Sequence, residues 1–172
     1  FTWNFRVTFK PQSSNRRLFS NSVSANGYEL YISTGGSVEV RVYTAGGHEE
    51  SILGVCPVTK PVTLTITKSG NVYTAYFNGI SGTSHTYTNP ILASSSLGKF
   101  FTSVADSYYM KCEVEDMRFF NYAFTEAEAK AYHNEFAKRV VLTEDFEGNG
   151  IGELPRGWEL VSGDYEVKEY VM

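Results

Sequence analysis

Two acidic side chains near the end of the chain offer the first chemistry to consider. Glu113 and Glu115 are separated by one residue, so on a β-strand both would point to the same side. Two carboxyl groups about 5 Å apart are what a retaining glycosidase uses as nucleophile and acid/base. Asp116 follows directly, and Met117 to Phe119 add no further acid. The segment is therefore a candidate catalytic site, to be weighed against a structural role.

A second set of candidates comes from two segments that we expect to pair as a hairpin. Gly35 and Gly36 separate residues 28–32 from residues 38–43, and both segments alternate apolar with polar side chains. If the valines of the second segment point inward, five side chains share the outer face: Glu29, Tyr31, Glu39, Arg41 and Tyr43. Sugar binding needs an exposed aromatic plane beside groups that hydrogen-bond hydroxyls. We predict a glycan platform here, with tyrosines that merely cover the outer face of a sheet as the alternative.

Composition and charge narrow the classes of partner. The net charge of -4, without a basic stripe, predicts no binding of nucleic acid or of an anionic membrane surface. No apolar run approaches the roughly 18 residues that span a bilayer, so membrane insertion is not expected. Because the chain begins at Phe1, we expect a processed product or a piece of something longer. Cys56 and Cys112 are too far apart for a metal or redox motif, and they could equally form a disulfide or remain two buried thiols.

Short alternating segments with tight turns between them dominate the chain. Each alternates or is rich in β-branched and aromatic residues, and we expect strands at 3–10, 28–32, 38–43, 62–67, 72–77, near 85–87, at 99–102 and at 107–120. Residues 46–50 are expected to form a loop. About ten strands without an intervening helix predict a sandwich or barrel.

One helix is expected after the last strand. Thr125 is a suitable N-cap, and Glu128 three residues later completes a capping box. Phe124 can pack against Ala129 as a hydrophobic staple. The helix is expected to end near Lys138, whose charge suits a helix C-terminus.

Three segments in a fixed order resemble a known family. Residues 1–11 (FTWNFRVTFKP), residues 62–79 (VTLTITKSGNVYTAYFNG) and residues 112–136 (CEVEDMRFFNYAFTEAEAKAYHNEF) are similar to the concanavalin A-like jelly roll of laminin-G-like and pentraxin-like domains. The resemblance implies an all-β fold, a two-sheet antiparallel jelly-roll sandwich with one short C-terminal helix, over residues 1–138. Residues 139–172 look like a linker and the start of a second β-sandwich, serving as a docking tail or the beginning of a further domain.

The resemblance also bears on the acidic segment. In the family pattern, the positions of Asp116 and Arg118 support the return loop and the junction with the helix, which implies a structural role for both. The family-16 glycoside hydrolases share this jelly roll, but their motif Glu-x-Asp-x-[x]-Glu has a third acid that is absent here. With Cys112, Val114 and Met117 expected to face the core, the glutamates fall on a solvated outer face. We therefore predict that the domain is not an enzyme.

Calcium is the one cofactor that the resemblance brings into consideration. Laminin-G-like and pentraxin-like domains often bind calcium through loop oxygens, and the ion takes about six to eight oxygen ligands. The candidate ligands lie in expected loops and turns: Glu49, Glu50, Asn78 and Asp106. None belongs to a dense acidic run of the EF-hand kind, so calcium is an open alternative.

These observations lead to three ordered hypotheses. The first is a non-catalytic binding module for glycans or glycosylated surfaces, with a role in adhesion, in a larger secreted, cell-surface or virion protein. The second is a structural or assembly module that contacts other protein chains, as in a phage virion or fibre. The third, a glycosidase-like enzyme, is the least supported because its acidic motif is incomplete.

Overall fold

The computed structural model describes residues 1–103 and 108–137, which form ten strands and one helix. In chain order the elements are β1 (Thr2–Phe9), β2 (Arg16–Ser20), β3 (Tyr28–Ile32), β4 (Ser37–Thr44), β5 (Gly47–Val55), β6 (Pro61–Ser69), β7 (Val72–Phe77), β8 (Ile80–Thr86), β9 (Lys99–Phe100), β10 (Cys112–Phe120) and α1 (Glu126–Ala137). The predicted segment 139–172 lies outside the described residues.

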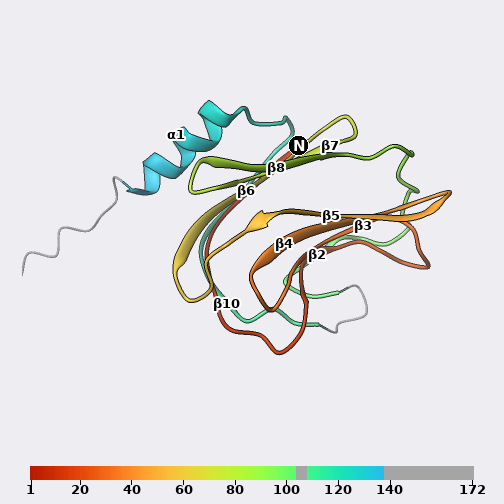
Figure 1. Cartoon of the computed structure of the whole chain (residues 1–172), viewed down its shortest axis with the longest axis horizontal. Helices are drawn as coiled ribbons and strands as arrows, with labels where there is room; N and C mark the ends of the chain where they lie inside the picture. Colours follow the sequence, from red (N-terminus) through yellow and green to blue (C-terminus); the bar gives the residue numbers. More distant parts are fainter. Residues whose placement is uncertain (104–107, 138–172) are drawn as a thin grey trace, which may run out of the picture. The chain divides into compact units, whose positions relative to one another are not determined.

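The strands form two antiparallel five-stranded sheets. The first has the order β10-β1-β6-β7-β8 and the second the order β5-β4-β3-β2-β9. Figure 1 shows the sheets as the two layers of a sandwich. Since the first sheet pairs β1 with both β6 and β10, its register joins segments far apart in the sequence. The fold is therefore the predicted jelly-roll sandwich.

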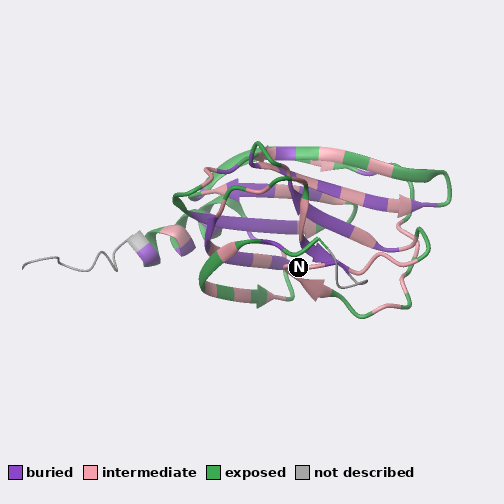
Figure 2. Cartoon of the chain, turned by 90° about the horizontal axis from the view of Figure 1, so that it is seen from below, coloured by how far each residue is buried: buried purple, intermediate pink, exposed green. Residues whose placement is uncertain are grey.

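The core lies between the sheets and follows the alternation of the strands. Phe5, Val7 and Phe9 of β1 are fully or almost fully buried, and so are Val38 and Val40 of β4. Figure 2 shows the resulting alternation of buried and more exposed residues along the strands. Because successive side chains of a strand point to opposite faces, each inward apolar row leaves a polar row outside. This outcome confirms the predicted inward orientation of the β4 valines.

One expectation about a segment was wrong, and another held for the direction of the side chains but not for their burial. Residues 46–50 do not form a loop, because β5 begins at Gly47 and pairs with β4 along its whole length. Val114 and Met117 of β10 face inward beside Val7 and Phe5, yet they are 43% and 38% exposed. The reason is that β10 is an edge strand, and the corresponding edge of the other sheet, β9, has only two residues.

Helix α1 is joined to β10 by the predicted structural residues. The backbone N–H of Thr125 donates to Glu128 Oε2 at 2.7 Å, and the backbone N–H of Glu128 donates to Thr125 Oγ1 at 3.3 Å, which completes the capping box. Arg118 Nε lies 2.8 Å from Asp116 Oδ2, and the Tyr132 hydroxyl donates to that same oxygen. These contacts tie the last strand to the helix. No helix in the described part of the chain is long and apolar enough to cross a membrane.

Both cysteines are free thiols in the structure. Cys56 is buried, and its Sγ donates to the backbone carbonyl of Gly36 at 3.2 Å. Burial raises the pKa of Cys56 to about 12, so this thiol stays protonated at neutral pH. Of the two alternatives left open by the sequence, the structure shows the reduced form.

Two buried tyrosines make a matched test of hydrogen bonding in the core. Tyr73 and Tyr87 are 0% and 1% exposed and pack edge to face with ring centroids 5.3 Å apart. The Tyr87 hydroxyl donates to the backbone carbonyl of Val40 at 3.3 Å, whereas the Tyr73 hydroxyl has no hydrogen-bond partner among the described residues.

Tyr73→Phe is therefore expected to raise the free energy of unfolding by about 1 kcal/mol, because it removes an unsatisfied buried hydroxyl. Tyr87→Phe is expected to lower it by about 1 kcal/mol, because it leaves a buried carbonyl without its donor. Urea unfolding followed by circular dichroism measures both changes. Destabilisation of similar size in the two variants would contradict the assignment of Tyr73 as unsatisfied.

Candidate functional site

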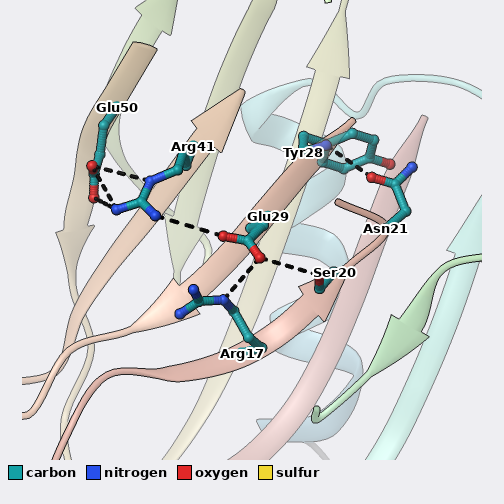
Figure 3. Close-up of polar contacts among 7 residues, drawn as sticks. All are labelled: Arg17, Ser20, Asn21, Tyr28, Glu29, Arg41 and Glu50. Atoms are coloured by element: carbon teal, nitrogen blue, oxygen red, sulfur yellow. Dashed lines mark hydrogen bonds and ion pairs between the residues drawn. The ribbon is translucent and has the colours of Figure 1, made fainter. Parts of the chain in front are cut away.

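A row of polar side chains crosses four strands on the outer face of the second sheet. Ser20 of β2 lies opposite Glu29 of β3, Glu29 opposite Arg41 of β4, and Arg41 opposite Glu50 of β5. Figure 3 shows these side chains pointing toward one another, with Arg17 of β2 beside them. The strand pairing thus assembles one continuous polar network from residues spread over more than thirty positions.

Glu29 is the centre of this network. It is only 5% exposed, although it lies on the outer face of the sheet. Its Oε1 accepts a hydrogen bond from the Ser20 hydroxyl at 3.2 Å and forms an ion pair with Arg17 Nε at 3.1 Å. Its Oε2 lies 3.8 Å from Arg41 Nη1, an ion-pair distance rather than a hydrogen bond. The two arginines therefore cover Glu29 and neutralise it.

Arg41 is held on its other side by Glu50. Arg41 Nη2 and Nε donate to the two-oxygen carboxylate of Glu50 at 2.9 to 3.2 Å. Paired contacts of this kind fix the plane of a guanidinium group. Arg41 is thus preorganised, with part of its side chain still open to solvent.

The two more accessible glutamates of this face, Glu39 and Glu50, have raised pKa values. Partial burial raises the pKa of Glu39, and the charge of Arg41 offsets part of that rise. Partial burial also raises the pKa of Glu50, with Arg17 opposing the rise and Glu29 adding to it. Burial thus disfavours the charged form of both carboxyl groups, and a neighbouring arginine opposes that effect in each case.

A stack of aromatic and guanidinium groups lies beside the network. The guanidinium carbon of Arg17 is 5.1 Å from the ring centroid of Tyr31 and 5.2 Å from that of Tyr108. Arg41 approaches the Tyr31 ring as well, at 5.5 Å. Cation–π contacts of this kind hold the rings and the guanidinium groups in place.

The predicted role of Tyr31 as an exposed platform was wrong. Tyr31 does lie on the outer face, opposite Glu39, but it is 1% exposed because Arg17 and Arg41 cover its ring. The exposed aromatic plane of the stack is instead Tyr108, which is 52% exposed. Tyr31 therefore supports the arginines and is itself closed to a ligand.

The remaining predicted residues of the face are partly accessible. Glu39 and Tyr43 are half-buried on β4, and Tyr43 lies opposite His48 of β5 with ring centroids 6.1 Å apart. Together with Arg41 and Glu50 they form the accessible part of the outer face, by which we mean the outward-pointing side chains of the second sheet and Tyr108 beside them. The sequence had correctly placed Glu29, Tyr31, Glu39, Arg41 and Tyr43 on one face of the sheet.

Three members of the outer face were not foreseen as ligand-binding residues. Arg17 was given no role, Glu50 was placed in a loop and considered as a metal ligand, and Tyr108 was placed in a strand without a role. The sequence of β5, GHEESILGV, does not alternate, so Glu50 joins the site through the pairing of β5 with β4. Arg17 and Tyr108 join the site only through strand pairing and loop packing, such as the backbone hydrogen bond from Arg17 to Tyr108, whose N···O distance is 3.4 Å.

The family model described as the concanavalin A-like lectin/glucanases superfamily matches residues 1–130. The chain belongs to this superfamily. No protein with a curated description matches it in sequence.

Solved structures with the same lectin-like fold have distant sequences. The Ruminococcus gnavus IT-sialidase CBM40 bound to alpha2,3 sialyllactose is 11% identical, with a TM-score of 0.63 over 77% of this chain and 81% of that chain. The botulinum neurotoxin type G receptor binding domain is 13% identical, with a TM-score of 0.61 over 78% of this chain and 38% of that chain. The binding domain of Paraclostridial Mosquitocidal Protein 1 is 15% identical, with a TM-score of 0.58 over 78% and 37% of the two chains. At these identities the likeness establishes the fold of the lectin-like domain.

The residues expected to bind calcium in this superfamily member are not gathered together. Glu49 and Glu50 are successive residues of β5 and point to opposite faces, and Glu50 holds Arg41. Asn78 lies in the turn between β7 and β8 of the other sheet, where its side chain accepts from the Thr63 backbone N–H. Asp106 lies outside the described residues. Within residues 1–103 and 108–137 no group of three acidic, histidine or cysteine side chains could hold a metal ion, so the residues present do not fit a calcium site.

Glu49 has a structural task instead. Its carboxylate accepts hydrogen bonds from the backbone and side chains of Thr88 and Asn89, at 3.1 to 3.3 Å. Desolvation opposes its ionisation, but these hydrogen bonds outweigh that effect and lower the pKa of Glu49. The carboxylate thus anchors the loop that follows β8 to β5.

The two glutamates weighed as a glycosidase pair are ion-paired to a residue of β1 and to the residue directly after it. Glu113 Oε1 lies 2.7 Å from Lys10 Nζ, and Glu115 Oε2 lies 2.6 Å from Arg6 Nε. The register shifts between Arg6 and Val7, so Glu115 lies in a bulge rather than in a regular alternation with Glu113. These contacts give both carboxylates a structural partner on the lectin-like domain's first sheet.

Proposed function

We propose that this domain is a non-catalytic module that binds glycans through the outer face of its second sheet. The observation that carries the proposal is the combination of a preorganised charged network with an exposed aromatic ring. Tyr108 is 52% exposed and stacks on Arg17, which is itself held by Glu29. Such a face offers a sugar ring one apolar plane and several fixed hydrogen-bonding groups.

The proposed division of roles follows from accessibility. Tyr108 supplies the stacking plane, with Tyr43 as a second aromatic group at the other side of the face. Arg41 donates hydrogen bonds to sugar hydroxyls, and Glu39 and Glu50 accept them. Glu29 and Tyr31 are buried and position the arginines without touching the ligand.

Individual solved structures of similar fold support this proposal. Among them are a carbohydrate-binding module bound to sialyllactose and a neurotoxin receptor binding domain. For the present chain we infer the same broad activity, in a setting outside the cell such as a secreted protein or a surface.

A glycan array tests the proposal. The intact chain is expected to bind a subset of immobilised oligosaccharides, and Tyr108→Ala is expected to weaken that binding about tenfold or more, since loss of a stacking contact costs about 1 to 2 kcal/mol. Tyr122→Ala is the matched control, because Tyr122 is similarly exposed, at 49%, but packs beside Phe120 and Phe124 at the end of the other sheet. Silence of the intact chain over the whole array, or equal losses in both variants, would contradict the proposal.

A second candidate function is contact with other protein chains. It is favoured by the exposed apolar side chains of edge strand β10, namely Val114, Met117 and Phe119. Light scattering during gel filtration separates the candidates: a mass well above one chain, reduced by Phe119→Ser, would favour assembly over glycan binding.

A further inference from the structure

We propose that the glycans recognised by the outer face are neutral, that is, rich in hydroxyls and free of carboxylate and sulfate groups. This inference rests on the proposed function and names its ligand class. Three features of the face carry it: the balance of its charges, the prior engagement of its arginines, and the alternation of donors and acceptors.

The charges of the outer face are balanced. In register, Lys99 of β9 lies opposite Ser20, so one row of the sheet continues from Lys99 through Ser20, Glu29 and Arg41 to Glu50. The neighbouring row contains Arg17, Tyr31 and Glu39. The two rows thus contain three cations and three anions, in alternation. A face of this kind has no net positive charge with which to attract an anionic sugar.

Both arginines already have carboxylate partners. Arg41 is bound by Glu50 through two nitrogen atoms, and Glu29 lies on its other side. Arg17 is paired with Glu29, and its guanidinium group contacts two rings, Tyr31 and Tyr108. Lys99, at the end of the row, is not without a partner either. At either arginine, an anionic ligand would have to displace a carboxylate already in place, and it would meet the repulsion of the others.

Hydroxyl groups fit this arrangement better than anions do. A hydroxyl both donates and accepts, whereas a carboxylate or sulfate only accepts at neutral pH. Arg41 lies between two acceptors, Glu29 on β3 and Glu50 on β5, and Glu39 is the next outward residue of its own strand. Neighbouring hydroxyls of a sugar can accept from Arg41 while donating to Glu39 or Glu50. The more accessible groups of the face then find partners without the loss of an ion pair.

The test uses matched sets of oligosaccharides. Each neutral oligosaccharide on an array is accompanied by its sialylated and its sulfated derivative on the same backbone. The intact chain is expected to bind the neutral members at least about tenfold more tightly than their acidic derivatives. Tighter binding of the acidic members, or equal binding of both, would overturn this inference and leave the proposed function standing. No binding to any member would overturn the proposed function itself, and this inference with it.

A variant tests the physical reason for the preference. Glu50→Gln removes the carboxylate that holds Arg41, so the preference for neutral over acidic members is expected to shrink about tenfold. Glu113→Gln is the matched control, because it makes the same change of net charge at a glutamate that is ion-paired with Lys10 on the other sheet. Equal effects of the two variants would show that net charge, not the network, sets the preference, and would overturn the argument from Arg41.

Discussion

Replacement of Glu29 by glutamine is expected to lower the free energy of unfolding by about 3 kcal/mol. Glu29 is almost fully buried and neutralises Arg17 and Arg41. The amide keeps the shape of the side chain but removes its charge, which leaves two guanidinium groups without their common anion. Removal of one partner of a buried ion pair costs about 3 to 5 kcal/mol. We expect a value at the lower end of this range, because Arg41 keeps its ion pair with Glu50.

Glu50→Gln provides the matched control for this stability measurement. It removes a carboxylate from the same Arg41, but its side chain is about one third exposed, so solvent screens the charge. Its expected cost is below about 1 kcal/mol. Urea unfolding of both variants measures the two changes. Similar small effects would show that Glu29 is less important for the fold than its burial indicates.

Replacement of Gly36 by alanine is also expected to lower the free energy of unfolding by about 3 kcal/mol. Gly36 has a φ of +86°, and an added Cβ would lie 2.5 Å from the backbone carbonyl oxygen of Cys56. That carbonyl is part of the backbone, and the amide of Cys56 donates to the carbonyl of Gly36 at 2.9 Å, so neither group can move aside independently. A left-handed conformation costs a non-glycine residue about 1 to 2 kcal/mol, and the collision adds to this cost.

Gly35→Ala is the control for this prediction. The nearest atom to its added Cβ is the Ser33 hydroxyl oxygen, 4.0 Å away, and the residue is exposed. Gly35→Ala is expected to change the free energy of unfolding by no more than about 0.5 kcal/mol. Thermal and urea unfolding of the two variants gives the comparison, and equal stability of both would contradict the assigned geometry of the turn between β3 and β4.

The elements of the fold were largely predictable because their signals are local. Alternation with a period of two placed β1, β3, β4 and β6 and identified their apolar faces. The capping box at Thr125 and Glu128 located the start of α1, since it depends on residues three positions apart. Gly46 and Gly47 misled the prediction for β5, because glycine pairs are typical of turns and the strand starts at the second of them.

Exposure was the least predictable property of individual residues. Tyr31 and Val114 show the two ways in which a prediction of exposure from alternation fails. Tyr31 lies on an outer face but is covered by arginines of neighbouring strands. Val114 lies on an inner face but is 43% exposed, because it belongs to an edge strand. Alternation determines the direction of a side chain, whereas burial depends on what the rest of the fold places over it.

The sequence by itself determined which side chains of β3 and β4 face outward, and therefore that Glu29, Tyr31, Glu39, Arg41 and Tyr43 share one face. Only the tertiary structure decided that Arg17 and Glu50 complete the network, and that Tyr108 rather than Tyr31 presents the open ring. The physical reason is that the direction of a side chain follows from the local geometry of its own strand. The partners that a side chain meets depend on long-range pairing between strands, which no short stretch of sequence contains.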